Sequence, residues 1–283
     1  MSSDKIKIAQ KTSLELLKAF VDICNKYNLR YFVGGGTMLG AIRHKGFIPW
    51  DDDVDIDMPR KDFQRFLEIS DEAVKEYPFY DVISFYKGND FTIDVKFVDK
   101  RTEILVMDKY IPKKTYIGMD IVPIDGVPAN SFVRTIHLFR LNIIKCFYKL
   151  SILKMGGVVT NKAKKGYRAW YKKMLVYAGT KFPVEKILKH KSWVKRFTKA
   201  LMKYPYDDCR IVGTMQCEIR EKNIFPIEWY GKGTKYQFED IEVIGVDNYD
   251  AWLTQLYGDY MTLPDEKHRV SHNFEIIDED QPV

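Results

Sequence analysis

Apolar and polar residues follow two different periods along the chain. Apolar residues recur at helical spacing through residues 7–28, which predicts an amphipathic helix with one buried face. The apolar run 31–33 predicts a short strand that stops at three glycines, and residues 37–42 then predict a helix. Residues 54–58 alternate apolar with acidic side chains, which is the pattern of a strand with one face in water.

Further elements follow at short intervals up to about residue 128. The pattern predicts a helix at 61–75 and strands at 80–86, 92–98 and 119–123. Helices combined with an antiparallel or mixed sheet define an α+β fold class. We therefore expect residues 1–128 to form a core in which helices flank a mixed sheet.

The character of the chain changes after this core. Helical periodicities dominate residues 132–150, 167–177 and 184–204. The tail has strand-like pieces at 229–231, 236–238 and 241–244, followed by a predicted helix at 249–257. We therefore expect a basic, aromatic-rich helical insertion at 129–205 and a C-terminal part at 206–283 that completes the core domain.

Composition fits a folded globular protein. Of 283 residues, 46% are hydrophobic and 30% are charged, which argues against long disordered regions. The start of the chain has no apolar signal region, and no run of about 18 apolar residues is present, so we expect a cytoplasmic protein without a membrane-spanning helix. The four cysteines form no CxxC pair, which argues against a disulfide framework or a zinc site.

Charge is distributed unevenly. Residues 132–204 contain 19 Lys or Arg and one acid, Glu185, so they carry +18 where the whole chain carries +6, and the remainder carries −12. Basic charge interleaved with aromatic residues is compatible with nucleic-acid binding, with adsorption to an anionic membrane, or with a solvated helical face. We favour the membrane, and expect no nucleic acid, because the segment is helical in period. Its interleaved aromatic residues include Trp170, Tyr171, Phe182, Trp193 and Phe197.

A glycine-rich junction, Gly34-Gly35-Gly36-Thr37, lies between the predicted strand and helix. Glycines let a backbone approach a ligand closely, and the free N–H groups of a helix start attract anions. The junction therefore predicts a phosphate site, although glycine turns of this kind are common and the signal alone is weak.

Five carboxylates occupy the seven positions 51–57: Asp51, Asp52, Asp53, Asp55 and Asp57. On a strand, alternate side chains share a face, so Asp53, Asp55 and Asp57 project together. Crowded carboxylates repel unless a cation neutralises them, and their oxygens suit Mg²⁺ or Mn²⁺. A solvated acidic loop is the alternative, but the interleaved apolar residues indicate a buried strand face.

A site with two ions needs a third acid from another strand. Asp120 is the best candidate, and Asp94 and Asp125 are weaker ones; a turn or capping role is the alternative. Basic residues follow the glycines or border the site, and they either grip phosphate oxygens or form a solvated surface. These residues are Arg43, His44, Lys45, Lys96 and Arg101.

The run from Val33 to Asp57 resembles the signature of the LicD family, which includes bacterial phosphocholine transferases and, more distantly, fukutin and fukutin-related protein. Residues 119–125 and 256–264 also resemble family blocks. The resemblance covers residues 10–128 and 209–272, and the basic middle of the chain matches no motif.

The resemblance implies a nucleotidyltransferase-like fold. It assigns the metal-binding and catalytic roles to Asp53 and Asp55, with Asp120 as the third acid. These acids are expected to hold two ions of Mg²⁺ or Mn²⁺. The phosphate-binding glycine pair falls on Gly35 and Gly36, with Thr37 beside them. Asp57 stands where relatives often have a small residue, so Asp51, Asp52 and Asp57 are expected to be accessory acids.

The resemblance also implies a reaction. Phosphocholine, or a related phospho-alcohol, moves from CDP-choline or another CDP-alcohol to a sugar hydroxyl, and CMP leaves. Acceptors of this family are cell-surface glycans (teichoic acid, lipopolysaccharide or capsule precursors), often polyprenyl-linked, so the enzyme is expected at the inner face of the cytoplasmic membrane. Alternatives are a nucleotidyltransferase, a CDP-glycerol or CDP-ribitol phosphotransferase with another acceptor, and an inert binding module.

Overall fold

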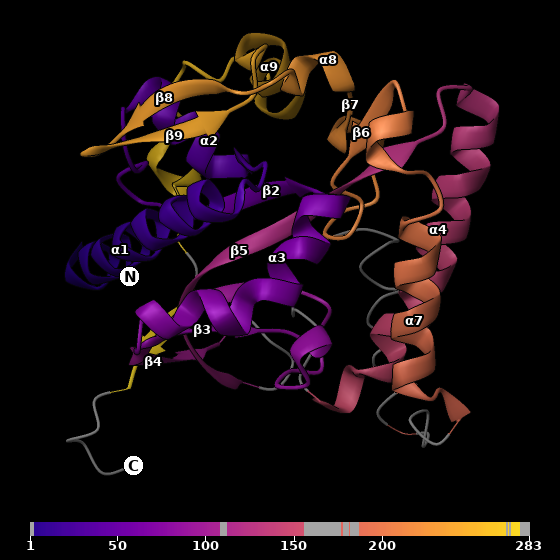
Figure 1. Ribbon diagram of the computed structural model, residues 1–283, viewed down its shortest axis with the longest axis horizontal. Helices are drawn as coiled ribbons and strands as arrows, with labels where there is room; N and C mark the ends of the chain where they lie inside the picture. Colours follow the sequence, from indigo (N-terminus) through magenta and orange to yellow (C-terminus); the bar gives the residue numbers. More distant parts are fainter. Residues whose placement is uncertain are drawn as a thin grey trace.

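A computed structural model describes residues 3–107, 112–155, 177, 181, 187–269, 271 and 273–277. A mixed sheet lies at its centre, in the order β1-β2-β5-β4-β10, with β3 added to β4, and with β6 and β7 continuing from β5. The pair β2–β5 is parallel and the neighbouring pairs are antiparallel. Helices flank this sheet, which confirms the predicted α+β class (Figure 1).

The strands are β1 (Phe32–Val33), β2 (Asp55–Pro59), β3 (Tyr80–Ile83), β4 (Val95–Val106), β5 (Lys113–Val127), β6 (Ile211–Gly213), β7 (Ile224–Pro226), β8 (Thr234–Phe238), β9 (Ile241–Gly245) and β10 (Phe274–Ile276). The α-helices are α1 (Ser3–Tyr27), α2 (Gly35–Arg43), α3 (Arg60–Ala73), α4 (Ser131–Ser151), α7 (His190–Leu201), α8 (Ile227–Tyr230) and α9 (Tyr249–Tyr257). Short 3₁₀ turns include Phe85–Lys87 and Leu153–Met155.

The main core forms where α1 and α3 lie across one face of the sheet (Figure 1). The helical spacing seen in the sequence buries Leu17 and Phe20 of α1 and Phe66 of α3 completely. The same cluster contains Phe238 and Trp252 from the C-terminal part. Residues from both ends of the chain thus share one core, as expected if the C-terminal part completes the core domain. The division of the chain at residues 128 and 205 stays a prediction.

A second core lies between α4 and α7, which stand side by side at the edge of the molecule (Figure 1). It contains Leu141 and Tyr148 of α4 and Phe197 of α7. The helix predicted at 132–150 is confirmed. The one predicted at 184–204 is confirmed over His190–Leu201 and does not extend back through Lys189, whose ψ of 105° is not helical. The prediction at 167–177 falls almost wholly outside the described residues.

Some strand predictions were wrong. Residues 229–231 end the short helix α8, where Pro226 precedes the first turn, Tyr230 is buried and Gly231 has φ +57°. The strand predicted at 80–86 stops at Ile83, because the Ser84 hydroxyl accepts a hydrogen bond from Tyr86 N–H and starts a 3₁₀ turn. A period read over so few residues does not separate strand from turn.

Across the described ranges, no helix has both the length and the apolar character that crossing a bilayer requires.

Candidate active site

Three acids meet where β2 and β5 run parallel. Asp55 and Asp120 are register partners on these strands, and Asp120 N–H donates to the carbonyl of Val54 at 2.9 Å. Asp53 lies two residues before Asp55. One carboxylate oxygen from each of the three lies within 4.8 Å of the others. The side chains predicted to form a metal site are therefore brought together.

The electrostatics of this cluster call for a cation. Burial, then the carboxylates of Asp53 and Asp120, raise the pKa of Asp55 well above its ordinary value. A divalent ion would remove this repulsion, and a set of carboxylate oxygens is the donor set that Mg²⁺ or Mn²⁺ prefers. Asp53, Asp55 and Asp120 thus fit the kind of metal ion that the sequence predicted.

The weaker candidates for the third acid lie elsewhere. Asp125 is buried and accepts two hydrogen bonds from Arg60, at 2.7 and 2.5 Å. It therefore acts as the partner of a buried guanidinium. Among the residues that the structure describes, the three-acid cluster does not include Asp94.

Lys96 is the cation next to the acids. It is the register partner of Asp120 across β4 and β5, and its Nζ lies 2.6 Å from Asp120 Oδ1. Burial acts to lower the pKa of Lys96, but the carboxylates of Asp120, Asp53 and Asp94 together outweigh burial and raise it. Lys96 stays 37% exposed, so its ammonium faces an accessible site.

The glycine junction packs directly on the acids. Gly35 has φ +44°, and a Cβ there would lie 2.3 Å from Asp55 Oδ2; a Cβ on Gly36 would lie 2.4 Å from Asp51 Oδ2. Only glycine lets the start of α2 approach these carboxylates so closely. The Thr37 hydroxyl accepts a hydrogen bond from Asp55 N–H at 2.9 Å. The helix start and the metal acids therefore form one continuous site.

The basic residues after the glycines lie at the other end of α2, about 12 Å along a helix of nine residues. Arg43 donates to the Tyr260 carbonyl at 2.7 Å and to His44 Nε2 at 2.9 Å. Burial lowers the pKa of His44, and the charge of Arg43 lowers it further. Lys45 is exposed. A phosphate-binding role for these three residues stays a prediction.

The accessory acids differ in environment. Asp57 is 6% exposed, its carboxylate lies beside Gly34, and burial raises its pKa to about 7. Asp52 is also buried, and Asp51 lies beside Gly36. None of these three belongs to the cluster formed by Asp53, Asp55 and Asp120.

Tyr257, the last residue of α9, was missed as a site residue. Partial burial, followed by the carboxylates of Asp55 and Asp51, raises its pKa. Tyr257 also acts on the pKa of Arg43, so it lies near both the acids and that guanidinium. Tyr257 falls within the family-like block 256–264, and that block is the sequence feature that could have indicated a role for it. A single partly exposed tyrosine has no periodic pattern that would single it out.

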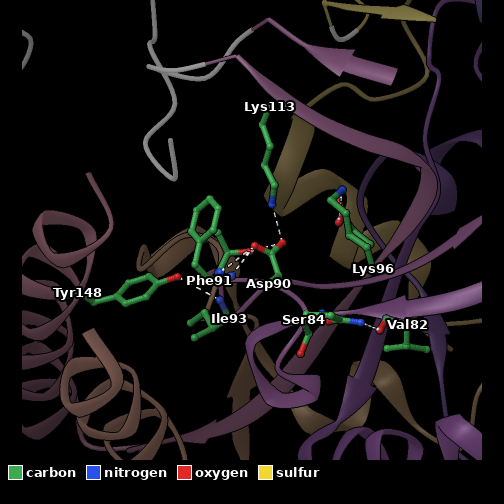
Figure 2. Close-up of polar contacts among 11 residues, drawn as sticks. Val82, Ser84, Asp90, Phe91, Ile93, Lys96, Lys113 and Tyr148 are labelled. Atoms are coloured by element: carbon green, nitrogen blue, oxygen red, sulfur yellow. Dashed lines mark hydrogen bonds and ion pairs between the residues drawn. The ribbon is translucent and has the colours of Figure 1, made fainter. Parts of the chain in front are cut away.

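A recess of about 590 Å³ opens on the same face of the sheet. Ile83 lines it and is the register partner of Lys96, and Tyr116 lies an even number of residues from Asp120 on β5. Figure 2 shows the Lys113 side chain reaching Asp90, with Phe91 beside it and Lys96 nearby. Lys113 Nζ lies 2.6 Å from Asp90 Oδ2 and 4.5 Å from the centre of the Phe91 ring.

Comparison with known sequences agrees with this geometry. Residues 28–123 match the family described as LicD/FKTN/FKRP, nucleotidyltransferase domain. The lipopolysaccharide cholinephosphotransferase LicD of Haemophilus influenzae is 29% identical over 272 residues, which cover 94% of this chain and 95% of that protein. Uncharacterized proteins of Rickettsia typhi and Rickettsia prowazekii are 27% and 28% identical, over 40% and 42% of this chain and 42% and 48% of their own lengths.

Proposed function

Because this chain belongs to the LicD family through its nucleotidyltransferase domain at residues 28–123, we propose that it transfers phosphocholine from CDP-choline to a sugar hydroxyl of a cell-surface glycan. The acceptor is a lipopolysaccharide or a related lipid-linked precursor, and CMP is the second product. The resemblance noted in the sequence is thereby confirmed at the level of the family.

The observation that carries the proposal is the meeting of three acids and a glycine-rich helix start at one place. Asp53, Asp55 and Asp120 would hold Mg²⁺ or Mn²⁺, which neutralises the charge that develops on CMP and on the transferred phosphoryl group. The start of α2 packs against the same acids, and the free N–H groups of a helix start offer a phosphate site.

Bond changes in the proposed reaction are those of an in-line displacement. The sugar oxygen attacks the phosphorus that carries choline, and the bond from that phosphorus to the oxygen shared with CMP breaks. The hydroxyl proton passes to the Asp120 carboxylate, and CMP leaves with the electron pair. Lys96, freed from Asp120 at that moment, pairs with phosphate oxygens.

We assign the choline end of the donor to the recess beside Lys96. There, Lys113 holds a positive charge against both the Phe91 ring and the Asp90 carboxylate. A quaternary ammonium lacks hydrogen-bond donors and is recognised by aromatic faces, so it suits the same pair. Ile83 and Asp120 are two strand spacings apart, about 10 Å, which a short phospho-alcohol bridges.

Other aromatic residues suit this role less well. Phe91 lines the recess although it also packs against the second core, whereas the recess is not lined by Tyr80, Phe85, Tyr86, Trp229 or the fully buried Tyr230. Phe91→Ala is expected to raise the KM for CDP-choline severalfold to about tenfold, the order of a cation–π contact. The KM for a CDP-alcohol without a cationic group should stay unchanged, and Phe79→Ala, at an exposed phenylalanine, is the matched control.

The function is tested by incubating the protein with CDP-choline and Mg²⁺ or Mn²⁺, with and without a glycan acceptor, and measuring CMP. Acceptor-stimulated CMP release that is lost in Asp120→Asn but kept in Asp240→Asn supports the proposal, because Asp240 is an exposed partner of Lys18. Consumption of CDP-glycerol, CDP-ribitol or a nucleoside triphosphate in place of CDP-choline would refute it.

A further inference from the structure

The outward face of α4 carries a continuous apolar stripe. Its side chains follow one another at three or four residues, so they project from the same side of the helix. The members and their exposed fractions are Phe132 (73%), Ile136 (53%), Phe139 (68%), Ile143 (44%) and Phe147 (38%). Scattered exposed apolar residues are normal, but an aligned row of this size marks an interaction surface.

The stripe lies opposite the face that α4 buries. Leu138, Leu141 and Tyr148 belong to the second core between α4 and α7. On a helix with 3.6 residues per turn, the rows through Leu141 and Ile143 differ by about 200°. Figure 1 shows α4 at the edge of the molecule, and the exposed fractions of the stripe residues show that the stripe faces solvent.

The surroundings of the stripe are basic. The α4 sequence contains four Lys or Arg and no acid, and α7 contains four more, again with no acid. Phe147 stacks on Trp193 at 4.7 Å, and the Arg196 guanidinium lies 4.9 Å from the Trp193 ring centre. The apolar stripe of α4 is therefore continuous with the exposed, basic face of α7, where Lys195 and Arg196 lie.

We infer that the stripe of α4 and the basic face of α7 form a membrane-binding surface for anionic lipid. Apolar side chains enter the interface, while Lys and Arg meet the headgroups. From Phe132 to Phe147 the stripe is about 22 Å long, so α4 would lie flat on the bilayer. A second copy of the chain is a poor occupant, because a symmetric contact would place two basic layers face to face.

This surface lies within the basic segment 132–204 for which the sequence predicted membrane binding, but its stripe does not consist of the aromatic residues named there. Of the aromatic residues singled out there, Phe197 is fully buried and Trp193 stacks on Phe147. Trp170, Tyr171 and Phe182 lie outside the described residues. The residues that carry the inference belong instead to the uncharged stripe of α4. The sequence pattern alone did not show whether this apolar face of the helix is buried or exposed.

The inner face of α4 connects this surface to the site. The Tyr148 hydroxyl accepts a hydrogen bond from Ile93 N–H, close to the recess (Figure 2). Lys145 donates to the carbonyls of Gln216 and Cys217. A bilayer on the stripe would therefore lie one helix layer from the recess. The inference rests on the proposed function in one respect: the lipid-linked acceptor gives the membrane contact a purpose.

Vesicle sedimentation tests the inference with the whole protein. Binding is compared on vesicles of phosphatidylcholine alone and of phosphatidylcholine with one quarter phosphatidylglycerol. Wild type should bind the anionic vesicles, and Phe132→Ser/Phe139→Ser should bind at least about tenfold more weakly. Phe79→Ser removes another exposed phenylalanine, 52% exposed and outside the stripe, and should bind like wild type.

Circular dichroism and thermal melting check that the variants fold, and Ile136→Ser/Ile143→Ser is a second pair on the same stripe. Equal binding of wild type and both pairs, or no binding by wild type, would overturn the inference. The inference would also be overturned if wild type formed a dimer in sedimentation velocity, the substitutions dissociated that dimer, and wild type did not bind vesicles. CMP release with a soluble acceptor, measured without vesicles, reports separately on the proposed function.

Discussion

Asp55 and Asp120 stand directly opposite each other on the adjacent parallel strands β2 and β5. Long segments of chain separate them in sequence, and the register of these strands places their side chains on the same face of the sheet. Asp53 completes the cluster from the residues just before β2. The proposed metal site therefore depends on tertiary strand pairing as much as on the local acidic run.

Asp120→Asn should weaken metal binding and abolish most of the activity. A bound metal supplies several kcal/mol to a transition state, so the loss of transfer rate should be on the order of a thousandfold. At a metal concentration of about 100 Kd, Mg²⁺ or Mn²⁺ should stabilise wild type by about 2.7 kcal/mol. Thermal melting with and without metal measures this gain, which Asp240→Asn should retain. An unchanged gain in Asp120→Asn would exclude Asp120 as a ligand.

Gly35→Ala should impair catalysis more than folding. The new Cβ would meet Asp55 Oδ2 at 2.3 Å, and alanine disfavours φ +44°. The Asp55 carboxylate must then move away from Asp53 and Asp120. Gly258→Ala is the matched control, because Gly258 has φ +73° but its Cβ would meet nothing within 4 Å.

Metal titration and kinetics separate the two glycine variants. Both should lose about 1–3 kcal/mol of stability from backbone strain, and Gly35→Ala should lose more because its Cβ meets Asp55. Gly35→Ala alone should lose metal affinity and transfer rate. Equal kinetics for both variants would show that the close approach to Asp55 has no functional role.

Local pattern predicted much of the site. Alternation over residues 54–58 gave the acidic strand, and the glycines gave the helix start on which Gly35 and Gly36 meet the carboxylates. The ordering of the three third-acid candidates agrees with the geometry, since Asp120 joins the cluster. These features were accessible because each is set by neighbouring residues or by a block that resembles a family.

Features set by distant pairing were not predicted. Arg60 comes just before the helix predicted at 61–75, and nothing near it in sequence indicates Asp125 as its partner. The pairing of Lys96 with Asp120 follows from the β4–β5 register, and the outward stripe of α4 has the same period as its buried face. Which face of a helix is covered depends on packing, and the period alone does not contain that information.

Asp125→Asn should destabilise the fold strongly without touching the metal site. Arg60 and Asp125 are 8% and 2% exposed at their side chains, and the substitution leaves a buried guanidinium without its countercharge. Removing one partner of such a pair costs about 3–5 kcal/mol. Urea unfolding measures the loss, and Arg60→Met/Asp125→Leu should recover much of it. A loss below about 1 kcal/mol would mean that solvent already screens this pair.

Acid should destabilise the α4–α7 layer through His137. Its side chain is 4% exposed, its ring lies edge-on to Tyr204 at 4.9 Å, and burial lowers its pKa, with further lowering from Lys203 and Arg140 and an opposing effect from Asp125. The folded protein therefore holds this histidine neutral, while the unfolded chain takes up a proton once the pH falls below about 6.5. The free energy of unfolding should fall in that range with a slope of at most about 1.4 kcal/mol per pH unit for one proton.

His137→Phe keeps a ring against Tyr204 and should show a shallower slope. The remaining slope includes His190, whose pKa burial also lowers. Urea unfolding at a series of pH values from 7.5 to about 5 measures these slopes, and His268→Gln, at an exposed histidine, is the control. If His137→Phe and wild type lose stability in parallel as the pH falls, His137 is not the group that takes up the proton.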